Sequence, residues 1–85
     1  MFRIWAKILK EERIQKQFVY ESDKSFTYSE FFDYLSEICG ALDEPTPVLL
    51  KTHIFNYAKF RHVTFRKDDF IEPVPFDKLV LENIL

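Results

Sequence analysis

The sequence predicts a small α+β domain in which a mainly antiparallel sheet carries its helices on one face. Three observations predict this fold class. They are period-two alternation near the start, one strongly amphipathic segment in the first half and an apolar strand-like stretch at the end. The expected order is β-β-α-(short α)-β, a small sandwich of sheet and helices. Eighty-five residues leave room for one core, so we expect a single domain spanning residues 1–85.

The first twenty residues alternate in the manner of two strands joined by a turn. In FRIWAKIL the even positions from 2 to 8 are apolar, and the odd positions place Arg3, Trp5 and Lys7 on the other face. RIQKQFVYE alternates similarly, and the polar KEER between the two stretches predicts a β-hairpin. No Asn-Gly or Asp-Gly pair is present, so the turn type stays open.

SFTYSEFFDYLSEICGALDEP changes to the three- and four-residue spacing of an amphipathic helix. Thr27 followed by Glu30 matches a capping box, and Pro45 prevents continuation. The expected buried face is Tyr28, Phe31, Phe32, Leu35, Ile38, Cys39 and Leu42. The expected acidic face is Glu30, Asp33 and Glu37.

The second half is less regular. TPVLLKTHIFNYAKF predicts an extended entry and then a short helix that Thr52 caps and that ends at Phe60. Residues 61–66 read as a short strand or extended segment, although a helix continuing through them stays open. DKLVLENIL is apolar on both faces, which suits a central or covered strand, and we expect it to pair with the first strand.

Two segments, RIWAKI at residues 3–8 and DDFIEPVPFDKL at residues 68–79, are similar to the two ends of a family of short uncharacterised bacterial proteins. The resemblance implies the same α+β class. It implies no activity, and it assigns no site residues.

The composition argues against catalysis and metal binding. The lone Cys39 allows no intramolecular disulfide and reads as a small buried hydrophobe. His53 and His62 fall in different predicted elements, while the adjacent Asp68 and Asp69 point different ways unless they lie in a tight loop. No nucleophile elbow is present, and one glycine cannot build a phosphate-cradling loop. We therefore expect no enzyme, no cofactor and no metal.

The start, MFRIWAKILKEERI, has neither the continuous apolar region nor the small-residue cleavage site of a signal peptide. No apolar run approaches the roughly 18–20 residues that a membrane span needs. The sequence therefore predicts a soluble cytoplasmic protein without membrane contacts.

KTHIFNYAKFRHVTFRK, residues 51–67, contains five basic and no acidic side chains within a chain of net charge −2. As one helix it would present a phosphate-contacting stripe, but the β-branched pair Val63 and Thr64 argues against that helix. We favour internal matching or solvated charge, with weak nucleic-acid binding as the alternative. That alternative would use Arg3, Trp5 and Lys7 together with Lys51, Lys59, Arg61, Arg66 and Lys67.

The favoured functional hypothesis is a non-catalytic interaction or inhibitory module that binds another protein. Trp5 is either an exposed anchor on an open sheet face or covered by residues 61–76. The acidic helix face could instead mimic phosphate spacing and occupy a basic groove. The candidate binding residues are Arg3, Trp5, Lys7, Glu30, Asp33 and Glu37. A structural homodimer that pairs its edge strands is a further alternative.

Overall fold

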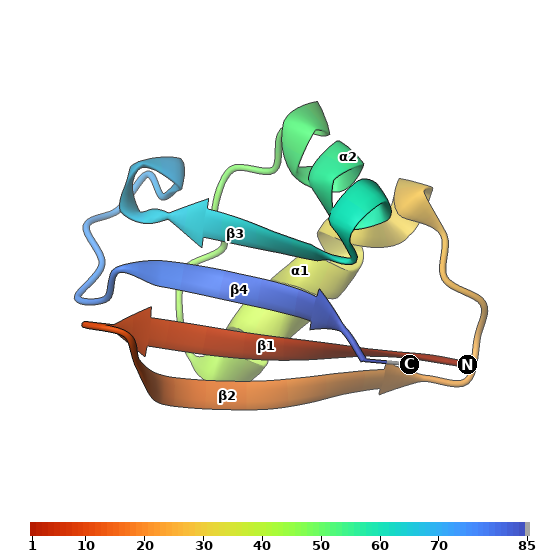
Figure 1. Ribbon diagram of the computed structural model, residues 1–85, viewed down its shortest axis with the longest axis horizontal. Helices are drawn as coiled ribbons and strands as arrows, with labels where there is room; N and C mark the ends of the chain where they lie inside the picture. Colours follow the sequence, from red (N-terminus) through yellow and green to blue (C-terminus); the bar gives the residue numbers. More distant parts are fainter. Residues whose placement is uncertain (85) are drawn as a thin grey trace.

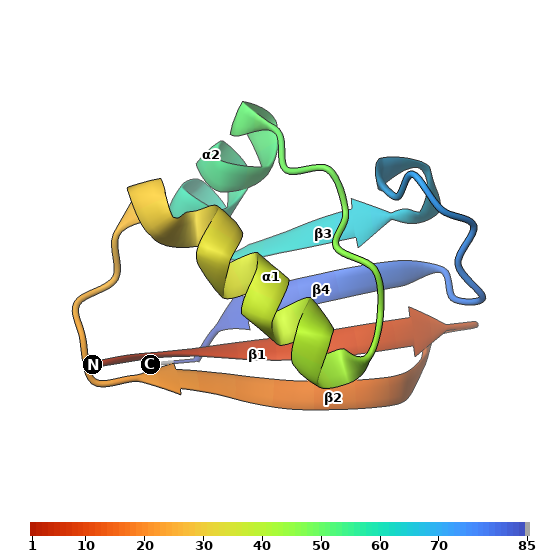
Figure 2. The same cartoon turned by 180° about the vertical axis from the view of Figure 1, so that it is seen from behind.

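A computed structural model describes residues 1–84 as a four-stranded antiparallel sheet with α-helices on one face (Figures 1 and 2). The strands are β1 (Phe2–Lys10), β2 (Arg13–Ser22), β3 (His62–Arg66) and β4 (Lys78–Asn83). The helices are α1 (Phe31–Leu42) and α2 (Lys51–Phe60), with short 3-10 turns at Tyr28–Glu30 and Lys67–Asp69. The sheet order is β2-β1-β4-β3. The predicted α+β class with helices on one face is confirmed.

The predicted N-terminal hairpin is confirmed. β1 and β2 pair from Phe2 opposite Ser22 to Lys10 opposite Arg13, with an irregularity between Ile8 and Leu9. The loop between them consists of Glu11 and Glu12, which have φ values of 52° and 65°. Two positive-φ loop residues define a type I′ turn, whose twist matches the flanking strands. The Glu11 N–H donates to the Asp77 carboxylate (2.7 Å), which ties the turn to the segment before β4.

β4 occupies a central position between β1 and β3, as its two apolar faces predict. It pairs with β1 from Ile4 opposite Asn83 to Leu9 opposite Lys78. The alternatives for residues 61–66 are also decided, because α2 ends at Phe60 and β3 begins at His62. Arg61 makes the break with a φ of 65°.

The predicted buried face of α1 is correct in part and wrong at two positions. Phe32 and Tyr28 are 53% and 48% exposed, whereas Phe31 is fully buried. Tyr34 is buried where Phe32 was expected to be, and its hydroxyl accepts the Thr27 N–H (3.2 Å). The predicted Thr27–Glu30 capping box is also wrong, because the Thr27 hydroxyl donates to the Glu30 carboxylate (2.7 Å) and α1 begins after the intervening 3-10 turn.

The predicted cap at the start of α2 is wrong as well. The helix begins at Lys51, before Thr52, and the Nδ1 atom of buried His53 accepts the Leu50 N–H (2.9 Å). The Nε2 atom of His53 lies 3.5 Å from the Asp69 carboxylate, and its ring centroid lies 4.4 Å from that of Phe65. His53 therefore joins α2, β3 and the following 3-10 turn.

Aromatic side chains fill one end of the core between the sheet and the helices. Phe26 contacts Phe2, Tyr34 and Tyr57, with ring centroids 5.2, 5.3 and 5.7 Å apart. Cys39 is buried as expected, and burial raises the pKa of its thiol to about 11.

Among residues 1–84 neither helix has the length and apolar character required to cross a membrane.

Candidate functional site

One side of the sheet carries no helix, and we call it the open face. Figure 1 views the sheet from this side, and across residues 1–84 neither view shows a segment crossing it. Because strand side chains alternate, the helix-free side presents the odd positions of β1 and the residues paired with them. Its centre consists of Trp5, Lys7, Gln17, Val19, Val80 and Glu82.

Trp5 is half-buried on the open face, and its neighbours there hold its ring in place. The indole N–H donates to the Gln17 side-chain oxygen (3.0 Å). The Lys7 Nζ atom lies 4.1 Å from the ring centroid, within the range of a cation–π contact. Val19, directly opposite on β2, is 41% exposed. Of the two alternatives left open, covering by residues 61–76 is not present, and the ring is a partly accessible, fixed aromatic surface.

Most charges at the centre of the open face have opposite partners. Lys7 contacts Glu82 on β4 at 3.1 Å, and Arg3 lies 4.0 Å from Glu21 on β2. The Lys7 side chain is 16% exposed, so it packs along the sheet rather than extending into solvent. The open face thus has an apolar aromatic centre with locally neutralised charge.

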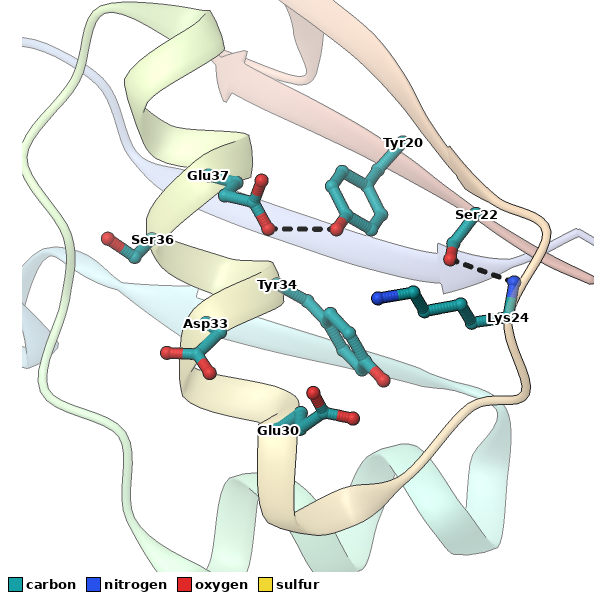
Figure 3. Close-up of a pocket in the computed structure, with 8 residues that line it drawn as sticks. All are labelled: Tyr20, Ser22, Lys24, Glu30, Asp33, Tyr34, Ser36 and Glu37. Atoms are coloured by element: carbon teal, nitrogen blue, oxygen red, sulfur yellow. Dashed lines mark hydrogen bonds between the residues drawn. The ribbon is translucent and has the colours of Figure 1, made fainter.

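A second concave surface lies between β2 and α1, and we call it the acidic groove (Figure 3). Its volume is about 500 Å³, and its chemistry is carried by Tyr20, Lys24, Glu30, Asp33, Tyr34 and Glu37. The Tyr20 hydroxyl donates to the Glu37 carboxylate (2.8 Å). Burial and this hydrogen bond raise the pKa of Tyr20 to about 12.

The three carboxylates predicted on the acidic helix face lie together along this groove. Glu30 ends the 3-10 turn, and Asp33 and Glu37 follow on α1, all with exposed side chains. None of the three joins an ion pair within the described residues. Lys24 reaches with its ammonium group into the space between Tyr20 and Tyr34 (Figure 3). The groove therefore concentrates negative charge and has room for a cationic side chain.

The basic residues of the nucleic-acid alternative are not gathered into one stripe. Lys51 opens α2 and Lys59 lies in its last turn, while Arg61 stands at the break before β3. Arg66 ends β3, and Lys67 begins the next turn, where its Nζ atom lies 3.9 Å from Asp77. The break at Arg61 removes the continuous helix that a single phosphate-contacting stripe requires.

Sequence reasoning missed a mainly apolar concave surface lined by Phe32, Thr46, Pro47, Val48, Leu49 and Ile71, of which Phe32, Val48 and Ile71 are exposed. Ile71 is 88% exposed, the highest exposure among the large hydrophobic residues of the described chain. Sequence reasoning also missed Tyr20 as a groove residue, because the alternation of its strand indicated only which side of the strand Tyr20 faces. The two prolines at 73 and 75 were the one signal that the neighbourhood of Ile71 is irregular.

Metal and acid–base candidates do not converge. His53 is buried against Phe65, whereas His62 lies on the exposed side of β3. Across residues 1–84, no group of three or more His, Cys, Asp or Glu side chains is placed to hold a metal ion.

Comparison of the chain with protein-family models, curated proteins and solved structures finds no match. The resemblance at residues 3–8 and 68–79 therefore stays a prediction. The open face and the acidic groove are the basis for the functional proposals that follow.

Proposed function

We propose that this chain is a non-catalytic interaction module that binds another protein through its open face. The observation that carries the proposal is the state of Trp5, a fixed and partly accessible indole on a sheet face that no segment of residues 1–84 crosses. Tryptophan and arginine dominate the binding energy of many protein interfaces, and they do so at central positions surrounded by weaker contacts. Trp5 lies at the centre of the open face, and Arg3 lies two residues before it on the same face of β1.

Fixing the ring before binding reduces the entropic cost of association. Gln17 and Lys7 already restrict Trp5, so a partner need not order it. The molecule extends 33 × 23 × 21 Å, so its largest face is of the order of the ~800 Å² that one partner buries in a standard interface. The whole open face, rather than one pocket, is therefore the proposed contact.

The nucleic-acid alternative has less support. Its basic residues are dispersed around α2 and β3, and Lys7 and Arg3 on the open face already have acidic neighbours. Phosphate binding depends on basic groups that act together along a backbone. Trp5 alone could stack on a base, but stacking without converging cations gives weak binding at physiological salt.

Affinity capture with the native chain, Trp5→Ala and Phe55→Ala tests the proposal. Phe55 is the matched control, since it is 63% exposed but lies on α2 rather than the open face. A protein recovered with the native chain is purified and titrated against all three. We expect Trp5→Ala to lose at least about 2 kcal/mol of binding free energy and Phe55→Ala to lose almost none. Equal binding of the recovered partner to native chain and Trp5→Ala would refute the proposal.

A further inference from the structure

β2 is an edge strand whose outer side pairs with no other strand among residues 1–84. It contains ten residues, none of which is proline, and its side chains are exposed or half-buried throughout. Figures 1 and 2 show no segment beyond it. Proteins protect sheet edges with charged side chains, bulges, proline or a covering segment. In β2 the charge of Lys16 and the register irregularity beside it lie in the first half of the strand, and among residues 1–84 neither proline nor a covering segment protects the rest. The regular stretch from Gln17 to Glu21 is therefore available for pairing.

The ladder shows which backbone groups of β2 face outward. The Arg3 and Leu9 carbonyls accept hydrogen bonds from Ile84 and Asp77, so the odd residues of β1 turn toward β4. Since backbone groups alternate along a strand, the even residues of β1 turn toward β2 and bond with Lys16, Phe18, Tyr20 and Ser22. The remaining β2 positions Gln17, Val19 and Glu21 therefore direct their N–H and C=O groups away from the sheet.

The acidic groove adjoins this same edge. Tyr20 and Ser22 line it from β2, and the carboxylates of Glu30, Asp33 and Glu37 line it from the α1 side (Figure 3). A strand added to β2 would turn alternate side chains toward the helices and the others toward the open face. Its helix-side residues would then meet three carboxylates that have no ion-pair partners in the described chain.

We propose that the outer edge of β2 takes up an extended segment of another protein as a fifth strand, and that the acidic groove selects Lys or Arg at alternate positions of that segment. Main-chain pairing supplies sequence-independent affinity, and the groove supplies the preference for basic side chains. Lys24 shows that a cationic side chain fits the groove (Figure 3). The edge shares Gln17 and Val19 with the open face, but it is used through their backbone groups and does not depend on Trp5.

A second copy of this chain suits the edge less well than a basic segment. Antiparallel pairing of two β2 strands about a two-fold axis places both α1 helices on the same side of the joined sheet. The two acidic grooves, each with Glu30, Asp33 and Glu37, would then face one another across the junction. Like charges brought together oppose association, whereas a basic segment brings the opposite charge.

The test uses synthetic peptides of about eight residues, the length of an ordinary strand. One alternates Lys and Val, and a second alternates Glu and Val. Two further Lys/Val peptides carry N-methyl groups on one or the other alternate set of amides. Binding to the whole chain is measured by fluorescence anisotropy. We expect the Lys/Val peptide to bind at least about tenfold more tightly than the Glu/Val peptide. One N-methylated peptide should lose binding and the other should keep it, since only one set of amides faces β2.

Variants of the chain locate the site. The combined change Glu30→Gln, Asp33→Asn and Glu37→Gln should weaken the Lys/Val peptide about tenfold and reduce its salt dependence. Val19→Pro removes an outward N–H without removing a hydrogen bond of the sheet, and it should abolish binding. Gln17→Pro serves the same purpose if Val19→Pro does not fold by circular dichroism. Trp5→Ala should bind the peptide as the native chain does, which separates this test from that of the open face.

Several results would overturn the proposal. They are no binding of the Lys/Val peptide at about millimolar concentration, equal binding of the Glu/Val peptide, and indifference to both N-methylation patterns. If the triple carboxylate variant bound the Lys/Val peptide as tightly as the native chain does, the proposed role of the acidic groove would also be wrong. Sedimentation showing a dimer that Val19→Pro dissociates would assign the edge to a second copy instead. If neither proline variant folds, the N-methylated peptides with the native chain still decide the question.

Discussion

The two faces of β1 differ more sharply than any other neighbouring surfaces of the molecule. On the helix side Phe2, Ile4, Ala6 and Ile8 are each at most 5% exposed. On the open face the residues between them, including Trp5 and Lys7, are all half-buried, and Trp5 contacts Lys7 on its own strand and Gln17 on β2. One strand thus supplies core burial on one side and a prepared contact surface on the other. Substitutions on the two sides should separate stability from binding.

The largest contrast is expected between the neighbours Phe31 and Phe32 on α1. Phe31 is fully buried, so Phe31→Ala should cost about 3–5 kcal/mol of unfolding free energy. Phe32 is 53% exposed, and Phe32→Ala should cost less than about 1 kcal/mol. Urea unfolding measures both. Similar losses for the two variants would mean that the observed phase of α1 is wrong.

Ile4 and Trp5 make the same comparison on β1. Ile4→Ala removes a fully buried side chain from the core and should cost about 2–4 kcal/mol. Trp5→Ala removes a larger but half-buried side chain from the open face and should cost about 1–2 kcal/mol. Denaturant midpoints together with acrylamide quenching of Trp5 fluorescence check this prediction. A quencher-resistant Trp5 in the monomer would contradict the accessible open face.

The two histidines extend the contrast to β3. His53→Ala removes the acceptor for the Leu50 N–H and the ring packed on Phe65, so about 1–3 kcal/mol should be lost. His62 is exposed, and His62→Ala should change stability by less than about 0.5 kcal/mol. Thermal melts at one pH compare them directly. EDTA or zinc should leave both melting temperatures unchanged, because neither residue belongs to a converging ligand set.

A smaller effect is expected from Tyr20 at the acidic groove. Tyr20→Phe removes the hydrogen bond to Glu37 and should cost about 0.5–1.5 kcal/mol near neutral pH. The folded-state pKa of Tyr20 is raised from 10 to about 12, so its contribution is present below pH 10 and is lost as the pH rises toward 12. Burial raises the pKa of Tyr57 to about 12 in the same direction.

Urea midpoints between pH 8 and pH 11 should therefore fall for the native chain and fall less for Tyr20→Phe. Tyr57→Phe should also reduce the fall, since the pKa of its buried phenol is likewise raised to about 12. If the urea midpoint of the native chain rose over this range, the expected loss of stability with rising pH would be contradicted.

The smallest expected effect concerns nucleic acid. The native chain should show no binding to mixed single- or double-stranded nucleic acid at about micromolar concentration in 150 mM salt. Lys59→Ala and Arg66→Ala should behave identically to it in this assay. Tight, steeply salt-dependent binding that these two variants lose would favour the alternative function.

The sequence predicts those elements whose local pattern and tertiary role agree. The alternation of β1 separates Ile4 from Trp5 correctly, and the two apolar faces of β4 indicate its central place. The phase of α1 could not be predicted, because Phe31 and Phe32 are adjacent and equally apolar. In the structure Tyr34 lies inward and accepts the Thr27 N–H, a contact that composition does not specify.

The candidate surfaces were predicted only in part for the same reason. Trp5, Arg3 and Lys7 share a strand face, so one period of alternation groups them. The acidic groove requires that Tyr20 and Glu37 meet across 17 positions of sequence, and no local pattern specifies that contact. The type of the Glu11–Glu12 turn could not be predicted from residue preferences either, since glutamate is not typical of positive φ.

The sheet order also has a consequence for how the chain acquires its structure during synthesis. The central strands β1 and β4 are joined by contacts such as Lys7 to Glu82, which lie 75 positions apart. At translation rates of about 5–20 residues per second, β1 emerges on the order of 4–15 s before its central partner. During that interval the inner edge of the hairpin has no strand to bond, so the four-stranded sheet cannot close until β4 lies between β1 and β3. The sheet therefore stays incomplete until β4 emerges, and a ribosome paused before Lys78 would hold a hairpin and helices without a closed sheet.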